Sequence, residues 1–371
     1  MESDLDLDSW IAKEAIQGGW SPYGLSTERA PRRRWWVWNP NNELRPYRRT
    51  LYSMRDWEKH RSMTRYLTHL ASLPGSGMFR SLLPPLAALT AWAAALAAWA
   101  AGAAAGALPA WVPPGLAAYP SVSMEPFHLT AFALSLLLGF RTNIAHERWA
   151  AARGHWADLV STVRSLCRLC MVHTPSERAA LRSCTWLRAF TTVVLYRLRE
   201  DPDVAAAVEG AGLSAGEAAA VVGALSPGAL CLQEVSFLVK ETMDGGARQT
   251  VEAELLALDR LATRCDGLVR SPVPLFYTQH LTQVIVGWLG LLPLPLVGLL
   301  GWQAVPAVAG IGFVLMGLDE IGQQIEEPFG ILPLESTAQA VETDVDTLVR
   351  ARAARRGARA WWRGGGPAAP E

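Results

Sequence analysis

A single arginine directly follows a long apolar run in this sequence and is the residue best placed to do chemistry. The run Leu136–Phe140 is followed by Arg141, Thr142 and Asn143. These three side chains bring a guanidinium, a hydroxyl and an amide, all hydrogen-bond donors, to one short stretch of chain. A charge inside or at the edge of a membrane span is costly to keep, so it is treated as functional by default.

Two long blocks of low charge predict that the segment before Arg141 crosses a membrane. From Ser81 to Phe140 the only formal charge is Glu125, and from Ser271 to Leu318 there is none. A bilayer core needs about 20 apolar residues per helix, so each block is long enough for two helices. We place the four spans at 82–107, 126–143, 277–300 and 303–320, with prolines and glycines marking the turns.

The basic residues predict how these spans are oriented. All 34 Lys and Arg lie outside the two apolar blocks. Basic segments tend to stay on one side of a membrane, so the arginine-rich stretches 29–80, 141–270 and 348–363 are expected to share one face. The net charge is zero and carries no information about partners.

The charge pattern therefore predicts an all-α membrane protein with two membrane hairpins around a helical extramembrane domain. The expected parts are a basic juxtamembrane segment (1–80), a first hairpin (81–143), the extramembrane domain (144–272), a second hairpin (273–320) and a C-terminal segment (321–371). The last part ends in Gly364–Pro367, which is typical of a disordered tail.

The expected extramembrane domain has the periodicity of helices. Trp149, Trp156, Leu159 and Val163 recur at steps of three, four and seven residues, which places them on one helix face. Strand-like alternation of useful length is missing from the segment. Asp201–Pro202 interrupts the pattern, and the chain regains it further on.

The cysteines favour packing over chemistry. The five cysteines all fall in the expected extramembrane domain (Cys167, Cys170, Cys184, Cys231 and Cys265). An odd number argues against a disulfide framework. Cys167 and Cys170 have the CxxC spacing of some metal and redox sites, but no second CxxC accompanies them, so we expect a structural role.

The N-terminal region does not resemble a targeting sequence. Met1–Asp8 is acidic, and no short apolar stretch precedes Ser81. Either no transit peptide exists or one has been removed. Pro31–Trp36 mixes arginine with aromatic residues, which favours contact with anionic lipid headgroups over binding of nucleic acid, because membrane spans follow.

No pattern of catalytic residues stands out. His128, His146, His155 and His280 are scattered without zinc-ligand spacing. The sequence has no arrangement resembling a nucleophilic triad, and Gly312–Gly317 lacks the Lys of a phosphate-binding loop. We predict no enzyme, no cofactor and no metal.

Four motifs, which follow one another in the order found in the bestrophin family, resemble that family. They stand at Phe140–Asn143 with His146–Trp149, at Ser271–Thr278, at Glu320–Gly330 and, upstream, at Arg49–Tyr52 with Trp57–Ser62. The upstream motifs resemble the plant and algal chloroplast branch. The resemblance implies a pentameric, mostly anion-conducting channel, with four membrane helices per subunit and the second helix lining the pore.

The resemblance also implies roles for the residues around Arg141. The apolar neck of the family's pore falls on Phe132, Leu136 and Phe140, whose spacing puts them on one helix face, and such a neck can gate by dewetting. Arg141, Thr142 and Asn143 become the candidates for anion binding and selectivity. Spacing alone favours a lipid-facing or helix-packing stripe, and the resemblance reverses this preference. The alternative for Arg141 is an anchor at the lipid headgroups.

One feature of the calcium-activated animal members is missing from the sequence. They carry a run of acids after the Pro-Phe-Gly motif, whereas Gly330 is followed by four apolar residues and then Glu335. Calcium needs six to eight oxygen ligands, so we predict no such site. Asp319, Glu320, Glu326 and Glu327 are expected at a solvated surface or in salt bridges with residues 29–80.

The expected function is passive conduction of chloride across the thylakoid membrane by a homopentamer, with the termini and middle domain on the stromal side. Bicarbonate is a close alternative, either as a second permeant anion or as the dedicated cargo of algal carbon supply. A membrane-anchored scaffold and a cation channel stay open. The expected partners are monovalent anions, lipid and further copies of the chain.

Overall fold

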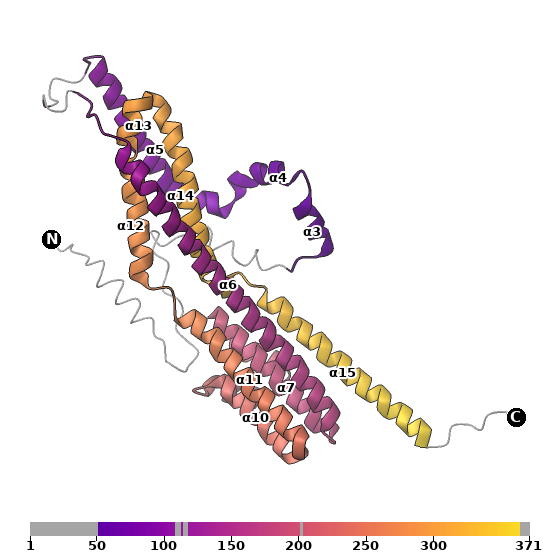
Figure 1. Cartoon of the computed structure of the whole chain (residues 1–371). Helices are drawn as coiled ribbons and strands as arrows, with labels where there is room; N and C mark the ends of the chain where they lie inside the picture. The colour runs from indigo at the N-terminus through magenta and orange to yellow at the C-terminus, as the bar shows by residue number, and fades with distance from the viewer. Residues whose placement is uncertain (1–50, 108–112, 114–117, 201–202, 364–371) are drawn as a thin grey trace. The chain divides into compact units, whose positions relative to one another are not determined.

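A computed structural model describes residues 51–107, 113, 118–200 and 203–363, and the elements in these residues are all helical (Figure 1). The described residues form two compact units. Residues 51–151 and 271–332 form one, which we call the apolar unit, and residues 152–270 and 333–363 form the other, the polar unit. The expectations for Pro31–Trp36 and for Gly364–Pro367 lie outside the described residues.

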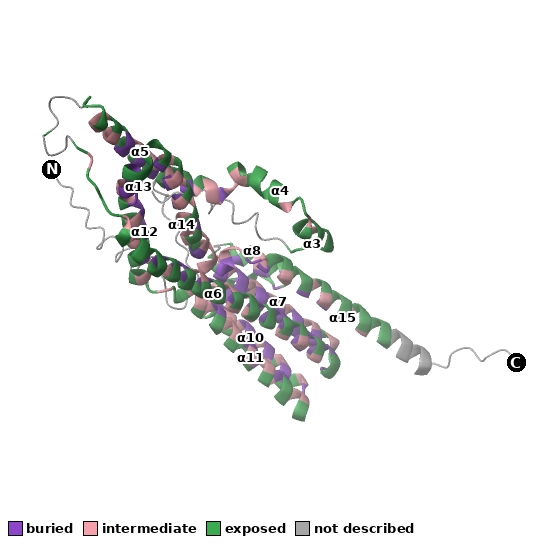
Figure 2. Cartoon of the chain, turned by 45° about the horizontal axis from the view of Figure 1, so that its top comes forward, coloured by how far each residue is buried: buried purple, intermediate pink, exposed green. Residues whose placement is uncertain are grey.

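Within the described residues, three helical stretches are long and apolar enough to cross a membrane, namely Gly77–Ala104, Glu125–His173 and Leu275–Glu326, and the apolar unit holds the first, the third and the first half of the second. Its helices are α3 (Met54–Arg61), α4 (Arg65–Ser72), α5 (Gly77–Ala104), the first half of α6 (Glu125–His173), α12 (Leu275–Leu291), α13 (Pro293–Leu300) and α14 (Ala304–Glu326), with short 3-10 turns between some of them. Figure 2 shows α3 and α4 largely exposed, and neither has a buried residue.

The third apolar stretch folds back on itself at one glycine. Gly301, which follows α13, has a φ of +56°, a conformation that glycine adopts without strain. The helices on either side of this turn, α12–α13 and α14, then lie side by side (Figure 1). Two apolar arms therefore occupy the region where we predicted 277–300 and 303–320, while the number of spans in a bilayer stays a prediction.

Glycines on α14 let its neighbours approach closely. A Cβ added at Gly312 would lie 2.8 Å from Cδ2 of Leu89, and one added at Gly317 would lie 3.1 Å from Cε of Met78. Both neighbours are on α5, which packs along α14. Small residues serve the same purpose wherever helices pack in membranes.

Helix α6 does not end where the sequence turns polar. It runs unbroken over 49 residues from Glu125 to His173, a length of about 73 Å at 1.5 Å per residue. The predicted end of the span near 143 is therefore a change in the surroundings of the helix and not a break in its backbone. The second half of α6 belongs to the polar unit.

The polar unit is a bundle around apolar side chains of the predicted helix face. Its other helices are α7 (Glu177–Arg199), α8 (Val204–Gly210), α9 (Ala215–Gly223), α10 (Pro227–Thr242), α11 (Gly245–Arg270) and α15 (Leu334–Arg363). Trp156, Leu159 and Val163 of this face are buried, whereas Trp149, in the apolar unit, is only half-buried. The weakly patterned stretch 203–224 forms the short helices α8 and α9.

All five cysteines are buried in the polar unit, and none forms a disulfide. Burial raises the pKa of Cys231 and of Cys265 to about 12. Thiols with such a pKa are almost never ionised near neutral pH, and the thiolate is the reactive form. These two cysteines therefore serve as small apolar residues.

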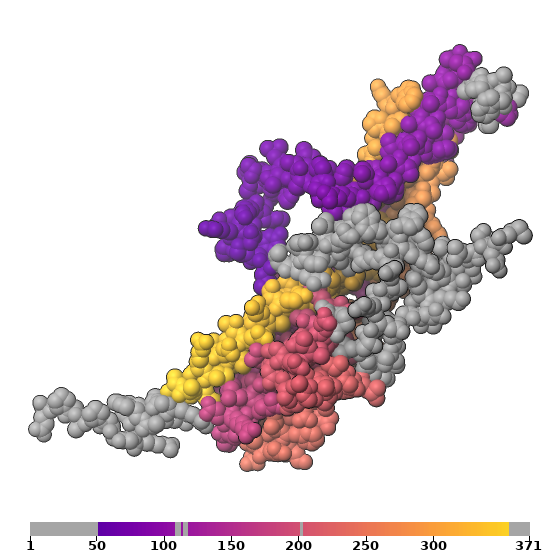
Figure 3. Space-filling view, turned by 180° about the vertical axis from the view of Figure 1, so that it is seen from behind, coloured from indigo at the N-terminus to yellow at the C-terminus, as the bar shows by residue number. Residues whose placement is uncertain are grey.

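Helix α15 packs against the rest of the polar unit and is held there by polar contacts (Figure 3). Arg199 Nη2 lies 2.7 Å from Glu335 Oε2, and Trp156 donates to the Thr337 hydroxyl at 2.7 Å. Further along, Arg352 donates to the Met171 carbonyl, which is among the last carbonyls of α6. Such carbonyls have no partner inside their own helix, so Arg352 caps α6 from another element.

The start of α9 makes stability depend on pH. The hydrogen bond from the Ser214 backbone N–H is the largest cause that holds the pKa of Glu217 below 4.5, its ordinary value, and burial opposes it. The Ser214 hydroxyl and the Arg182 guanidinium lower the pKa further. A carboxyl with a lowered folded pKa stabilises the fold above its unfolded pKa, and this stabilisation is lost as the pH falls through the folded pKa.

We therefore expect Glu217→Gln to lower the melting temperature near neutral pH, and the difference from the parent to shrink as the pH falls through the lowered pKa of Glu217. Thermal unfolding across this pH range measures the difference. Glu209→Gln removes the same charge from the exposed surface of α8 and serves as the control. A difference between Glu217→Gln and parent that persists at acidic pH would contradict the ionised capping box.

Candidate functional site

The predicted neck residues lie on a face of α6 that the chain itself leaves open. The exposed fractions are 75% for Phe132, 46% for Leu136 and 53% for Phe140. The opposite face of the same helix carries Leu134 and Leu138, which are buried in the apolar core. Helix α6 thus has two apolar faces, one that packs within the subunit and one that is available to another partner. We call Phe132, Leu136 and Phe140 the neck stripe.

Arg141 turns away from the neck stripe and is buried. Its side chain is only 5% exposed, and its Nε lies 2.8 Å from Oδ1 of Asp319 on α14. The N–H is not aligned for a hydrogen bond with that oxygen, so the contact is an ion pair. The arginine rests on the backbone of Gly322, where an added Cβ would lie 3.2 Å from Arg141 Nε.

Thr142 and Asn143 differ in their surroundings. The Thr142 hydroxyl donates to the carbonyl of Leu138, one turn earlier, at 2.8 Å. Asn143 is exposed, and its Nδ2 donates to Oε1 of Glu147 at 3.1 Å. Because Asn143 follows Leu136 by seven residues, it continues the face of the neck stripe. The structure thus brings Asn143, and not Arg141, into line with the neck stripe.

The sequence analysis did not predict that Asp319 is the partner of Arg141. We expected Asp319 at a solvated surface or paired with residues 29–80, and that expectation is wrong, since the carboxylate faces Arg141 on α6. A signal was present in the sequence. Arg141 is the first charge after one apolar block and Asp319 is the first after the other, and opposite charges that end two packed apolar helices can meet.

Arg148 connects the polar end of this region to two other segments. Its Nη1 donates to the Ser271 carbonyl at 2.8 Å, and its Nε donates to the Glu326 carbonyl at 3.3 Å. These carbonyls lie just before α12 and at the last residue of α14. One guanidinium therefore holds three parts of the apolar unit in register, through donors that fan out in a fixed geometry.

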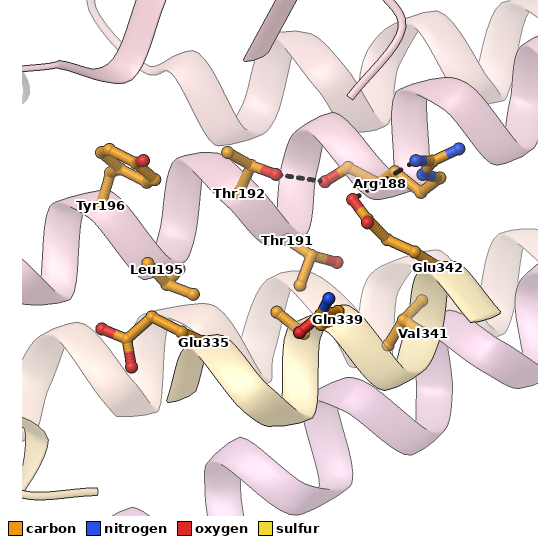
Figure 4. Close-up of a pocket in the computed structure, with 10 residues that line it drawn as sticks. Arg188, Thr191, Thr192, Leu195, Tyr196, Glu335, Gln339, Val341 and Glu342 are labelled. Carbon is orange, nitrogen blue, oxygen red and sulfur yellow. Dashed lines mark hydrogen bonds and ion pairs between the residues drawn. The ribbon is translucent and has the colours of Figure 1, made fainter. Parts of the chain in front are cut away.

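The polar unit also has a cleft. It has a volume of about 310 Å³ and lies between α7 and α15, with Arg188, Thr192 and Glu342 among its walls (Figure 4). Arg188 is paired with Glu342 at 3.3 Å, and the Thr192 hydroxyl donates to the Arg188 carbonyl at 3.1 Å. The charges of Arg188 and Glu342 are thus paired with each other, and we place the functional site on α6.

The comparison with known proteins decides the family. Residues 56–347 match the family model described as bacterial and fungal bestrophin protein. The chain belongs to the bestrophin family. The resemblance carried by the Phe140–Asn143 and Glu320–Gly330 motifs is thereby confirmed.

Relatives of this bestrophin include proteins of chloroplasts and cyanobacteria. It is 28% identical over 310 residues to a protein named voltage-dependent chloride channel 2, chloroplastic, of Arabidopsis thaliana, covering 82% of this chain and 74% of the relative. It is 29% identical to a voltage-dependent anion channel-forming protein of Synechocystis sp., covering 62% and 79% respectively. The predicted likeness to the plant chloroplast branch is confirmed by the first of these.

The fold agrees with a bestrophin of known structure. A bacterial bestrophin homologue from Klebsiella pneumoniae superposes with a TM-score of 0.63 at 21% identity, covering 71% of this chain and 97% of that one. At this identity the likeness concerns the fold alone.

The acidic segment of this bestrophin is used for packing and for local contacts. Besides the pairing of Asp319, the Glu320 carboxylate accepts from Gln324 Nε2 at 2.8 Å. Within the described residues, no group of three or more His, Cys, Asp or Glu side chains is placed to hold a metal ion. Independence from calcium stays a prediction.

We expect Arg148→Met to destabilise the folded subunit by about 2 kcal/mol, the loss typical of hydrogen bonds made by a charged donor. Arg148→Lys should recover only part of this, because one ammonium cannot reproduce the fork. Thermal unfolding in detergent measures both. Arg168→Met, on the exposed face of α6, is the control, and equal melting temperatures for Arg148→Met and Arg168→Met would contradict the role of Arg148.

Proposed function

We propose that this bestrophin is the subunit of an anion channel whose pore is lined by α6. The observation that carries the proposal is the neck stripe, a row of large apolar side chains that the folded subunit leaves exposed and that Asn143 continues. A face that changes from apolar to polar along one helix fits a pore with a dry constriction and a wet mouth. The names of the relatives support anions as the cargo.

The proposed channel is a homopentamer with four membrane helices per subunit. The buried faces of α5, α12 and α14 pack with α6 inside one subunit, so the neck stripe is free to face the same stripe of other copies. Five copies around an axis would form three successive apolar rings. The four spans are α5, the first half of α6, α12 with α13, and α14.

The proposed neck acts by controlling water. A narrow ring of Phe and Leu side chains binds no ion, and it blocks passage when it loses its water. Anions pass when the ring is wide enough to stay hydrated. Asn143 at the polar end would offer an amide N–H donor to an arriving anion. Its amide nitrogen carries two hydrogens, and the hydrogen bond to Glu147 uses one of them.

The proposed cargo is chloride, and bicarbonate is the alternative within the same class. Both are monovalent anions, and an apolar neck distinguishes them poorly. The names of two relatives support a chloroplast location. Within the chloroplast, the proposed site is the thylakoid membrane, with the polar unit on the stromal side as the placement of arginines predicts. In that place the channel would balance charge during light-driven proton pumping.

A reversal-potential measurement tests the function directly. In planar bilayers with a chloride gradient, the purified protein is expected to carry current that reverses near the equilibrium potential of chloride. Replacing chloride by bicarbonate on one side then ranks the two anions. A reversal near the potential of the cation would contradict the proposal, as would the absence of current from protein whose mass equals five chains.

Replacing all three neck residues, Phe132, Leu136 and Phe140, by alanine should raise single-channel conductance and weaken gating, because smaller side chains widen and wet the constriction. Single-channel recordings measure both. The matched control changes Val286, Leu299 and Val314 to alanine, since these are also exposed apolar residues but lie on other helices. The neck assignment fails if the two triple variants conduct alike.

A further inference from the structure

We infer that Arg141 is a positioning residue, which acts through Asp319 and Gly322 to fix the rotation of α6 and thereby the direction of the neck stripe. The inference rests on the proposed function, because it concerns the same pore helix. It differs from the expectation that Arg141 contacts the permeating anion. Three observations on the subunit carry it.

The first observation is that the charge of Arg141 is compensated within the subunit. The Arg141 side chain is 5% exposed and that of Asp319 is 16% exposed, and Arg141 Nε lies 2.8 Å from Asp319 Oδ1. Removing a charge from water is expensive unless a partner of opposite sign lies close. The pairing therefore keeps Arg141 against α14 and leaves little of its charge for an ion on the other side of α6.

The second observation is that the Arg141 side chain packs closely against a glycine of α14. Gly322 stands five residues after Gly317, which itself stands five after Gly312, and the three are buried. The first two receive side chains of α5, and Gly322 receives the Arg141 side chain, with Nε, Cγ and Cδ all within 3.6 Å of an added Cβ. A larger residue at this position would displace the guanidinium.

The third observation is that the neck stripe is bracketed by two ties to the rest of the subunit. Before it, the Trp288 indole on α12 donates to the Thr130 hydroxyl at 3.0 Å and stacks edge-on against Phe127. After it, Arg141 is paired with Asp319 on α14. Successive residues of a helix differ by about 100° in direction, so fixing Thr130 and Arg141 fixes the direction of every residue between them.

A neutral replacement of the pair separates positioning from direct contact with ions. In Arg141→Met with Asp319→Leu, two apolar side chains of related size replace the ion pair, an exchange that buried pairs often tolerate. We expect the double variant to keep an anion-to-cation permeability ratio within about twofold of the parent. If instead Arg141 contacted ions in the pore, the variant would lose one such charge from each of five subunits. The anion-to-cation permeability ratio would then fall by about tenfold or more.

Each single variant leaves one buried charge without its partner. Arg141→Met and Asp319→Leu are therefore each expected to lower the melting temperature and the open probability, and the double variant is expected to restore both. This non-additivity is the mark of a pair that acts as a unit. Additive losses in the double variant would overturn the inference, as would a loss of selectivity in a double variant of parental stability.

Gly322→Ala tests the close contact between Arg141 and α14 without removing any charge. Its methyl group would press on Arg141, whereas Gly310→Ala, on the same helix, meets nothing within 4 Å. We expect Gly322→Ala to change open probability at an unchanged reversal potential, and Gly310→Ala to behave as the parent. Identical gating in the two alanine variants would overturn the inference, even if the double variant failed to fold.

Failure of the proposed function would look different. A parent protein that carries no anion current contradicts the channel, while the melting temperatures of the two single variants and the double variant still report whether Arg141 and Asp319 are coupled. A parent that conducts, together with additive melting temperatures, contradicts the positioning role alone.

Discussion

The folding of the apolar unit depends on one constraint, which is that a membrane interior offers no partner to a charge. Its two apolar blocks are followed by Arg141 and Asp319, and these charges meet. Backbone groups face the same constraint and are satisfied within helices. Because helices in lipid gain nothing from excluding water between them, close contact must come from small residues, and α14 supplies Gly312, Gly317 and Gly322 where neighbours press against it.

Periodicity and charge were sufficient to predict the long apolar helices and the helical extramembrane domain, because both report directly on the environment of each face. The short helices α8 and α9 lie in a stretch too weakly patterned to assign. The spacing of Phe132, Leu136 and Phe140 predicted one shared face, and the face is exposed. Spacing cannot distinguish lipid from a pore, since both accept apolar side chains. That distinction needs the position of other copies of the chain, and a single sequence does not encode it locally.

The pairing of Arg141 was beyond prediction for a different reason. Arg141 and Asp319 lie on helices that are far apart in the sequence, and their contact depends on how far α6 approaches α14, which a backbone glycine sets. The predicted boundary at 144 was also a statement about surroundings. Helix α6 crosses it unbroken because each backbone hydrogen bond joins residues four apart and is unaffected by whether the side chains meet lipid or protein.

A compensated arginine suits a passive anion channel better than a free one. Conduction requires that an ion be held weakly enough to leave, and five uncompensated guanidiniums in a dry constriction would hold an anion tightly, because charges interact strongly where water is excluded. In the proposed channel, pairing Arg141 with Asp319 would prevent such tight anion binding, while the side chain would still fix the rotation of α6. In the proposed channel, selectivity would then rest on weaker groups near the mouth, such as the amide of Asn143, whose N–H donors carry no formal charge.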